Sequence, residues 1–161
     1  MKRFPILALA AMAIFLFACT KENIATLRVE ESLAQELKNP RATIWTKTVQ
    51  LSPENEIAEV MTTAYGVAIF RLTADYTLHY RINVDDLPED DMLIAAHIHA
   101  GTSTVNGPVK IWLARSPADF GINKTVQLTE EEFQMLMNDA LYVNVHSIKY
   151  PAGLIRGQIR D

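Results

Sequence analysis

Hydrophobic and polar residues alternate in short runs along the chain from residue 44 onward. The clearest run is Leu-His-Tyr-Arg-Ile-Asn-Val at residues 78–84, in which every second residue is apolar. Alternation with a period of two is typical of strands that have one buried face. Comparable runs occur at residues 66–72, 93–100, 109–114, 125–128, 141–147 and 154–160. We therefore predict seven or eight short strands.

One segment between these runs has a different pattern. Thr129 precedes three glutamates, and Glu132 stands where a capping box requires an acidic or amide side chain. Phe133, Leu136 and Met137 then fall on one helical face, which predicts a short helix over about residues 130–139. The pattern indicates an all-β fold, namely an antiparallel two-layer β-sandwich of Greek-key type, like immunoglobulin or superoxide dismutase domains, with one helix. A closed barrel is the main alternative.

The first residues have the form of an export signal. Lys2 and Arg3 precede an uncharged apolar run at residues 6–17, which is too short to span a bilayer. The run ends in Leu-Phe-Ala-Cys, which resembles the lipobox of bacterial lipoproteins, and Cys19 is the single cysteine of the chain. We predict a lipoprotein signal peptide at residues 1–18, acylation of Cys19, a tether over residues 19–43 and a domain at residues 44–161. An ordinary secretory signal or an uncleaved anchor is the alternative.

Lipidation predicts a location for the protein, and the charge of the chain after residue 18 excludes one class of partner. An acylated Cys19 would hold the domain on a lipid bilayer of the cell envelope. Thr20 stands where an aspartate favours inner-membrane retention in Gram-negative lipoproteins, so we expect the outer membrane, on its periplasmic or surface side. Removal of residues 1–18 leaves 13 basic and 19 acidic side chains. Such an acidic protein lacks the electrostatic footprint of nucleic-acid binding.

Histidines mark the candidate site. His97 and His99 are two residues apart in a predicted strand, so their side chains project from the same face. A second strand places Asn144 and His146 on one face, with Tyr142, and valines on the other. The last strand has two polar residues on the face opposite its isoleucines: Arg156 and Gln158.

Two interpretations of this pattern remain open. In the first, His97, His99 and His146 bind copper or zinc and leave one coordination position free, with His79 as a possible additional ligand. Three polar residues would then orient the ligands or hold an anion near the metal: Asn144, Arg156 and Gln158. In the second, the imidazoles form a structural hydrogen-bond network and the domain is an interaction or adhesion module with an unknown protein partner. A redox enzyme of the dismutase type is a weaker third hypothesis, so no catalytic residue is assigned.

Several of these segments together resemble the CHRD domain, a module named after chordin and common in exported bacterial proteins. The resemblance covers roughly residues 44–161 and rests on Gly66 to Phe70, Leu78-His79-Tyr80, His97-Ile98-His99, Asn106-Gly107-Pro108-Val109, Tyr142 to His146, and Ile155 to Ile159. The final turn departs from the family, with Ala152-Gly153-Leu154 in place of Gly-Gly-Glu. The resemblance implies an all-β fold, and the family has no agreed catalytic activity.

Overall fold

The structure is a computed structural model that describes residue 35 and residues 38–161. The predictions for the signal peptide at residues 1–18, for Cys19 and for most of the tether lie outside the described residues. Among the residues that are described, no helix has the length and hydrophobicity that a membrane crossing requires.

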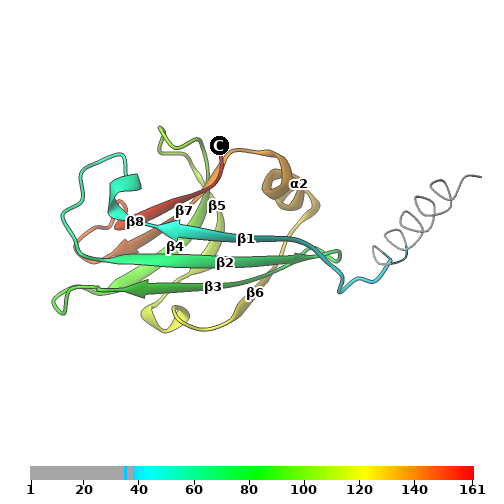
Figure 1. Cartoon of the computed structure of the whole chain (residues 1–161), viewed down its shortest axis with the longest axis horizontal. Helices are drawn as coiled ribbons and strands as arrows, with labels where there is room; N and C mark the ends of the chain where they lie inside the picture. The colour runs from blue at the N-terminus through cyan, green and yellow to red at the C-terminus, as the bar shows by residue number, and fades with distance from the viewer. Residues whose placement is uncertain (1–34, 36–37) are drawn as a thin grey trace, which may run out of the picture. The chain divides into compact units, whose positions relative to one another are not determined.

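The predicted fold class is confirmed. Eight strands form two antiparallel sheets, and the strands are β1 (Thr43–Leu51), β2 (Tyr65–Thr73), β3 (Thr77–Asp85), β4 (Leu93–Ala100), β5 (Val109–Ala114), β6 (Lys124–Gln127), β7 (Leu141–Ser147) and β8 (Ile155–Arg160). The first sheet has the order β1-β2-β3-β6, and the second has the order β5-β4-β7-β8. Figure 1 shows the two sheets as two layers.

The connections have the Greek-key form that the sequence predicts. Strands β1, β2 and β3 form a meander, after which the chain crosses to the second sheet for the β4–β5 hairpin. Strand β6 then returns to lie beside β3, and β7 lies beside β4. Each return places a strand next to one that is three positions earlier in the chain, as in a Greek key.

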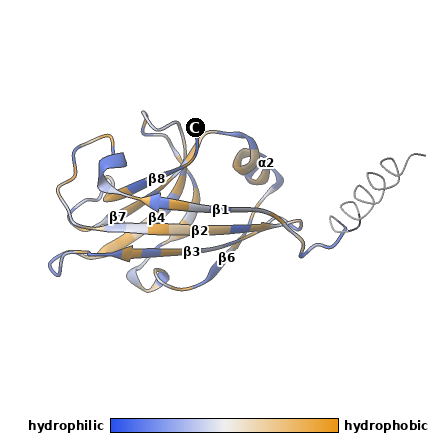
Figure 2. Cartoon of the chain, viewed as in Figure 1, coloured by the Kyte–Doolittle hydropathy of each residue, from blue (hydrophilic) through white to orange (hydrophobic). Residues whose placement is uncertain are grey.

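The core lies between the sheets and is built from alternate residues of the strands. Phe70, Leu72 and Leu78 of the first sheet are almost inaccessible, as are Ile98 and Val143 of the second. Figure 2 shows hydrophobic segments on the strands and on α2, while the turn after β3 is hydrophilic. This arrangement follows from the period of two, because one face of each sheet is apolar throughout.

Helix α2 (Glu130–Asn138) closes one end of the sandwich between β6 and β7, close to its predicted bounds. The capping box is present: the Glu132 backbone N–H donates to Thr129 Oγ1, and the Thr129 N–H donates to the Glu132 carboxylate. Leu136 is fully buried, and Phe133 stacks on Tyr76 with ring centroids 4.3 Å apart. Two short 3₁₀ turns, η1 (Pro53–Asn55) and η2 (Pro117–Asp119), complete the secondary structure.

The two sheets also meet at one corner. Ser52, just after β1, and Arg156 of β8 exchange two backbone hydrogen bonds, with N···O distances of 3.0 and 3.1 Å. A Cβ atom on Gly157 would lie 2.2 Å from the Gln50 carbonyl oxygen, so only glycine permits this approach. The chain that leaves this corner, residues 53–64, brings Glu56 against Asn144 on the outer face of the second sheet.

Candidate metal centre

The candidate histidines share the outer face of the second sheet. His97 and His99 alternate with the core residues of β4, and His146 alternates with the core residues of β7. In the β4–β7 register His97 pairs with Asn144, so His146 lies diagonally one step along the same face. The strand pairing therefore brings together side chains that are almost 50 residues apart in sequence.

This outer face is buried, whereas the sequence indicated only that it is the polar face of its strands. His97, His99 and His146 are only 7%, 8% and 7% exposed, and every residue of β7 is buried. The cover comes from loops rather than from a third layer of strands. Alternation in a single strand cannot reveal such a cover, because the covering residues come from distant parts of the chain.

Backbone carbonyls fix two of the rings. His99 Nδ1 lies 2.9 Å from the carbonyl oxygen of Gly107, and His146 Nδ1 lies 3.1 Å from that of Pro151. A carbonyl oxygen can only accept, so each Nδ1 must carry the proton. In the neutral ring Nε2 then has a free lone pair, which is the form that a metal binds.

His97 completes the group. Its Nδ1 lies 3.1 Å from His146 Nε2. When one ligand atom is taken from each of the three rings, all three separations are 4.8 Å or less. Two nitrogens bound to one tetrahedral zinc at about 2.0–2.1 Å are about 3.3 Å apart. The His97–His146 pair already has nearly that separation, so the group could hold a single ion once the remaining ring nitrogen moves closer.

Aromatic and cationic side chains hold the loop that anchors His99. The Tyr142 ring stacks on His99 with centroids 4.8 Å apart, and its hydroxyl accepts a hydrogen bond from the Gly107 N–H. The Arg156 guanidinium lies 3.4 Å from the centre of the Tyr142 ring on β7. Its amino groups donate to Asn106 Oδ1 and to the carbonyls of Thr102 and Val105. Arg156 therefore orders the 102–107 loop and, through it, the carbonyl that orients His99.

A tryptophan borders the site. The Trp112 ring meets the His97 ring edge to face, with centroids 4.0 Å apart, and Trp112 remains 43% exposed. The Arg115 guanidinium lies 3.9 Å from the centre of the Trp112 ring. Trp112 thus separates the imidazoles from solvent on the β5 side. Because its indole contacts His97, its fluorescence should respond to a ligand that binds there.

Burial keeps the imidazoles neutral. Desolvation, together with smaller effects of the neighbouring His146 and His99 rings and of Arg115, lowers the pKa of His97 to about 4. Desolvation also lowers the pKa of His99 and His146, although their hydrogen bonds to backbone carbonyls act in the opposite direction. Near neutral pH the three rings are therefore uncharged and do not repel one another or a cation.

The face has an excess of hydrogen-bond acceptors. Within residues 38–161, five buried side-chain atoms have no partner, namely Glu56 Oε1, His97 Nε2, His99 Nε2, Asn144 Oδ1 and Gln158 Oε1. The amide oxygens of Asn144 and Gln158 are acceptors, and so is His99 Nε2, because Nδ1 carries the proton. His97 Nε2 is also an acceptor while Nδ1–H donates to the lone pair of His146, and it carries the proton instead when Nδ1 binds a metal. Buried lone pairs without donors are costly, and a cation or a donor group would satisfy them.

The comparison with known proteins decides the family. The family model described as the CHRD domain matches residues 47–159, which is most of the chain. The chain belongs to the CHRD domain family. No curated protein and no solved structure is significantly similar to it. The matched residues of the CHRD domain include all three clustered histidines.

The other predicted site residues of the CHRD domain have separate positions. His79 lies on the outer face of β3 in the first sheet, beside Arg71, and is not part of the three-histidine group. Asn144 lies between His97 and Arg156 in one row across the second sheet. Gln158 pairs with Tyr142 and donates to the Gly101 carbonyl. Within the described chain, no side-chain hydrogen bond joins Asn144, Arg156 or Gln158 to a histidine ring.

Glu56 is a polar residue of this face that sequence reasoning did not select. Asn144 Nδ2 lies 3.4 Å from Glu56 Oε2, and a Cβ atom on Gly153 would lie within 3 Å of both side chains. Desolvation raises the pKa of Glu56 to about 7, against the opposing effects of Arg156 and Asn144. The carboxyl lies in an irregular segment without periodicity, so no sequence pattern indicates its burial.

A Glu56→Gln variant is expected to change the pH dependence of stability. The folded-state pKa lies above the unfolded value of 4.5, so folding takes up a proton between about pH 4.5 and 7. Glu56 therefore lowers stability as the pH rises through this range. We expect the variant to gain on the order of 1 kcal/mol over wild type on going from pH 5 to pH 8, because solvent still reaches part of the carboxyl.

Urea unfolding at the two pH values measures this gain. The matched control is Glu59→Gln, which removes an exposed carboxylate from the same segment and should follow the wild-type pH dependence. Parallel curves for wild type and Glu56→Gln would contradict the prediction.

Proposed function

We propose that this CHRD domain is a membrane-anchored, non-enzymatic module that binds one copper or zinc ion through His97, His99 and His146. The observation that carries the proposal is the set of three neutral imidazoles whose ring nitrogens converge within 4.8 Å in a buried site. Neutral imidazole nitrogen is a ligand that both metals favour.

The surroundings of the rings support metal binding over a purely structural network. A structural network would satisfy its members, yet His97 Nε2 and His99 Nε2 are buried without a partner. The carbonyls of Gly107 and Pro151 hold Nδ1–H of two rings, as oxygens near metal-bound histidines commonly do. The bound ion would draw the three rings together and tie β4 to β7.

The anchor is the second part of the proposal. Cys19 ends an apolar run and follows Leu-Phe-Ala, so lipidation there would place the domain on the outer membrane. The function of such a module is the handling of a metal in the cell envelope or the presentation of a metal-stabilised binding surface. An adhesion or interaction module with structural histidines is the alternative function.

Copper titration followed by tryptophan fluorescence tests metal binding. Cu²⁺ quenches indole emission at short range, and Trp112 lies against His97, whereas Trp45 packs against Phe70 of the first sheet. We expect emission to fall with an end point at one copper per chain, for protein purified without a histidine tag. Trp112→Phe should bind the same amount of copper by metal analysis and lose most of the quenching.

His79→Ala is the control for adventitious binding at a partly exposed histidine, and it should leave the end point unchanged. Linear quenching without an end point, together with less than one copper or zinc per chain by metal analysis, would refute the proposal and favour the structural alternative.

A further inference from the structure

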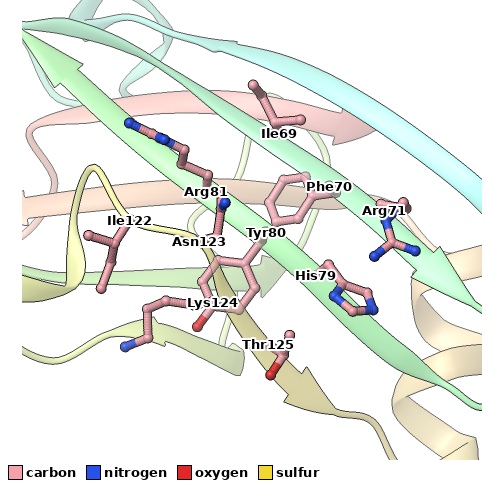
Figure 3. Close-up of a pocket in the computed structure, with 10 residues that line it drawn as sticks. All are labelled: Ile69, Phe70, Arg71, His79, Tyr80, Arg81, Ile122, Asn123, Lys124 and Thr125. Atoms are coloured by element: carbon pink, nitrogen blue, oxygen red, sulfur yellow. The ribbon is translucent and has the colours of Figure 1, made fainter.

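The outer face of the first sheet, opposite the histidine site, has an unusual distribution of charge. A shallow hollow of about 750 Å³ lies across β2, β3 and the segment that leads into β6. Its lining includes basic and apolar side chains and no carboxylate. We call Ile69, Arg71, His79, Arg81 and Ile122 the basic face, and Figure 3 shows them around the hollow.

The basic side chains of this face come from two adjacent strands. Arg71 of β2 is directly opposite His79 of β3, and Arg81 lies diagonally one step further along β3. Figure 3 shows the Arg71 and His79 side chains next to each other. Diagonal neighbours on one face of a sheet are within reach of the same ligand surface, so a broad anionic surface could contact both guanidinium groups. The chain as a whole is acidic, with a net charge of −4, so composition does not account for this concentration of positive charge.

The two arginines keep most of their hydrogen-bonding capacity. Arg71 donates only to Thr43 Oγ1, at 3.4 Å, and Arg81 donates to Asn83 Oδ1. The ion pairs among the described residues are Lys124–Asp119 and Lys149–Asp90, and neither includes an arginine. A guanidinium has five N–H donors in a planar fork that suits phosphate oxygens. The basic face therefore presents two guanidinium groups to solvent without an acidic partner.

Apolar side chains accompany these charges. Ile69 and Ile122 are 45% and 49% exposed on the rim of the hollow. Exposed isoleucines beside arginines match an amphiphilic anion, in which charged groups and hydrocarbon alternate over a broad surface. The headgroup region of an anionic bilayer has this chemistry, with phosphates at the level of the guanidinium groups and acyl chains beneath.

We propose that the basic face docks the domain onto the surface of an anionic bilayer. This inference rests on the proposed membrane anchor at Cys19. Cys19 precedes Thr43, the first residue of β1 in the same sheet, by 24 positions. A chain of that length keeps the domain near the bilayer, so a weak electrostatic contact of a few arginines becomes effectively intramolecular. Each arginine near an anionic surface strengthens such a contact roughly fivefold.

A single-cysteine reporter tests the contact in the acylated chain. Lipid blocks the Cys19 thiol, so Ile122→Cys supplies the free thiol for an environment-sensitive nitrobenzoxadiazole dye. The labelled chain is placed on vesicles of phosphatidylcholine alone or of equal parts phosphatidylcholine and phosphatidylglycerol. We expect at least a twofold rise in dye emission, with a blue shift, on the anionic vesicles. Ile148→Cys is the matched control, since Ile148 is 57% exposed beside the acidic Asp90 and Asp91 segment, and its dye should not respond.

Charge variants test whether the arginines cause the rise in dye emission. Arg71→Gln/Arg81→Gln in the Ile122→Cys chain should abolish the rise, and so should raised salt. Two lost arginine contacts correspond to a roughly 30-fold lower population of the docked state.

The acylated chain could stay on the vesicles while the emission of the dye at position 122 remains unchanged. This result would support the anchor and refute the docking surface. If the purified chain takes up the dye at Cys19, the thiol is not acylated. A chain of this kind that does not associate with vesicles overturns the anchor instead. An equal response at positions 122 and 148, or on neutral vesicles, also refutes the proposal.

Discussion

The His97→Ala/His99→Ala variant is expected to lose bound copper or zinc entirely. Two of the three donor rings are removed, and a single imidazole does not retain a metal against a chelator. With metal at about a hundred times its dissociation constant, the wild-type domain should gain about 2.7 kcal/mol of stability by mass action. That gain corresponds to a rise of about 10 °C in the melting temperature of a domain of this size, and the variant should show no rise.

Thermal melts with and without zinc, together with metal analysis after dialysis, measure both effects. His79→Ala is the matched control, because it removes an imidazole from the opposite face of the sandwich, and it should keep the full rise. Melting curves without metal separate folding from binding. A purely structural role for the histidines predicts that the double variant melts well below wild type without metal and that zinc leaves the wild-type melting temperature unchanged.

The Gly107→Ala variant is expected to be destabilised by about 3 kcal/mol or more. A Cβ atom at this position would lie 1.5 Å from the carbonyl oxygen of Ala100, so the backbone of the loop must move. That movement breaks two partly buried hydrogen bonds, from the Gly107 N–H to the Tyr142 hydroxyl and from His99 Nδ1–H to the Gly107 carbonyl. Loss of the carbonyl also frees the His99 ring to rotate, so metal affinity should fall together with stability.

Urea unfolding and a zinc titration against a competing chelator check this prediction. Gly121→Ala is the matched control, because Gly121 has φ +72° but no atom within 4 Å of an added Cβ. It should cost only about 1–2 kcal/mol, from the left-handed backbone, and leave zinc affinity unchanged. Equal stability losses in the two variants, or unaltered zinc binding by Gly107→Ala, would show that the loop does not position His99.

The fold could be derived to a large extent from the chain itself. The runs at residues 93–100, 109–114 and 141–147 coincide with β4, β5 and β7. These strands could be predicted because period-two alternation follows from the geometry of a strand with one buried face. Helix α2 was predicted for a similarly local reason, since a capping box acts within four residues. The sequence also assigned His97, His99 and His146 to polar faces, because alternation alone determines the face on which a side chain lies.

Only the tertiary structure determined which strands pair and which loops cover the histidine face. That β4 lies beside β7, and that His79 lies in the other sheet, depends on strand order, which no local pattern encodes. The burial of the histidine face depends on residues 53–64, 101–108 and 148–153, which fold over it from three separate parts of the chain.

The backbone carbonyls that fix the tautomers of His99 and His146 are likewise invisible in the sequence, because every residue has such a group. The local sequence pattern therefore determined which side chains lie on the polar strand faces. Long-range packing determined which of these side chains meet and how far water is excluded from them.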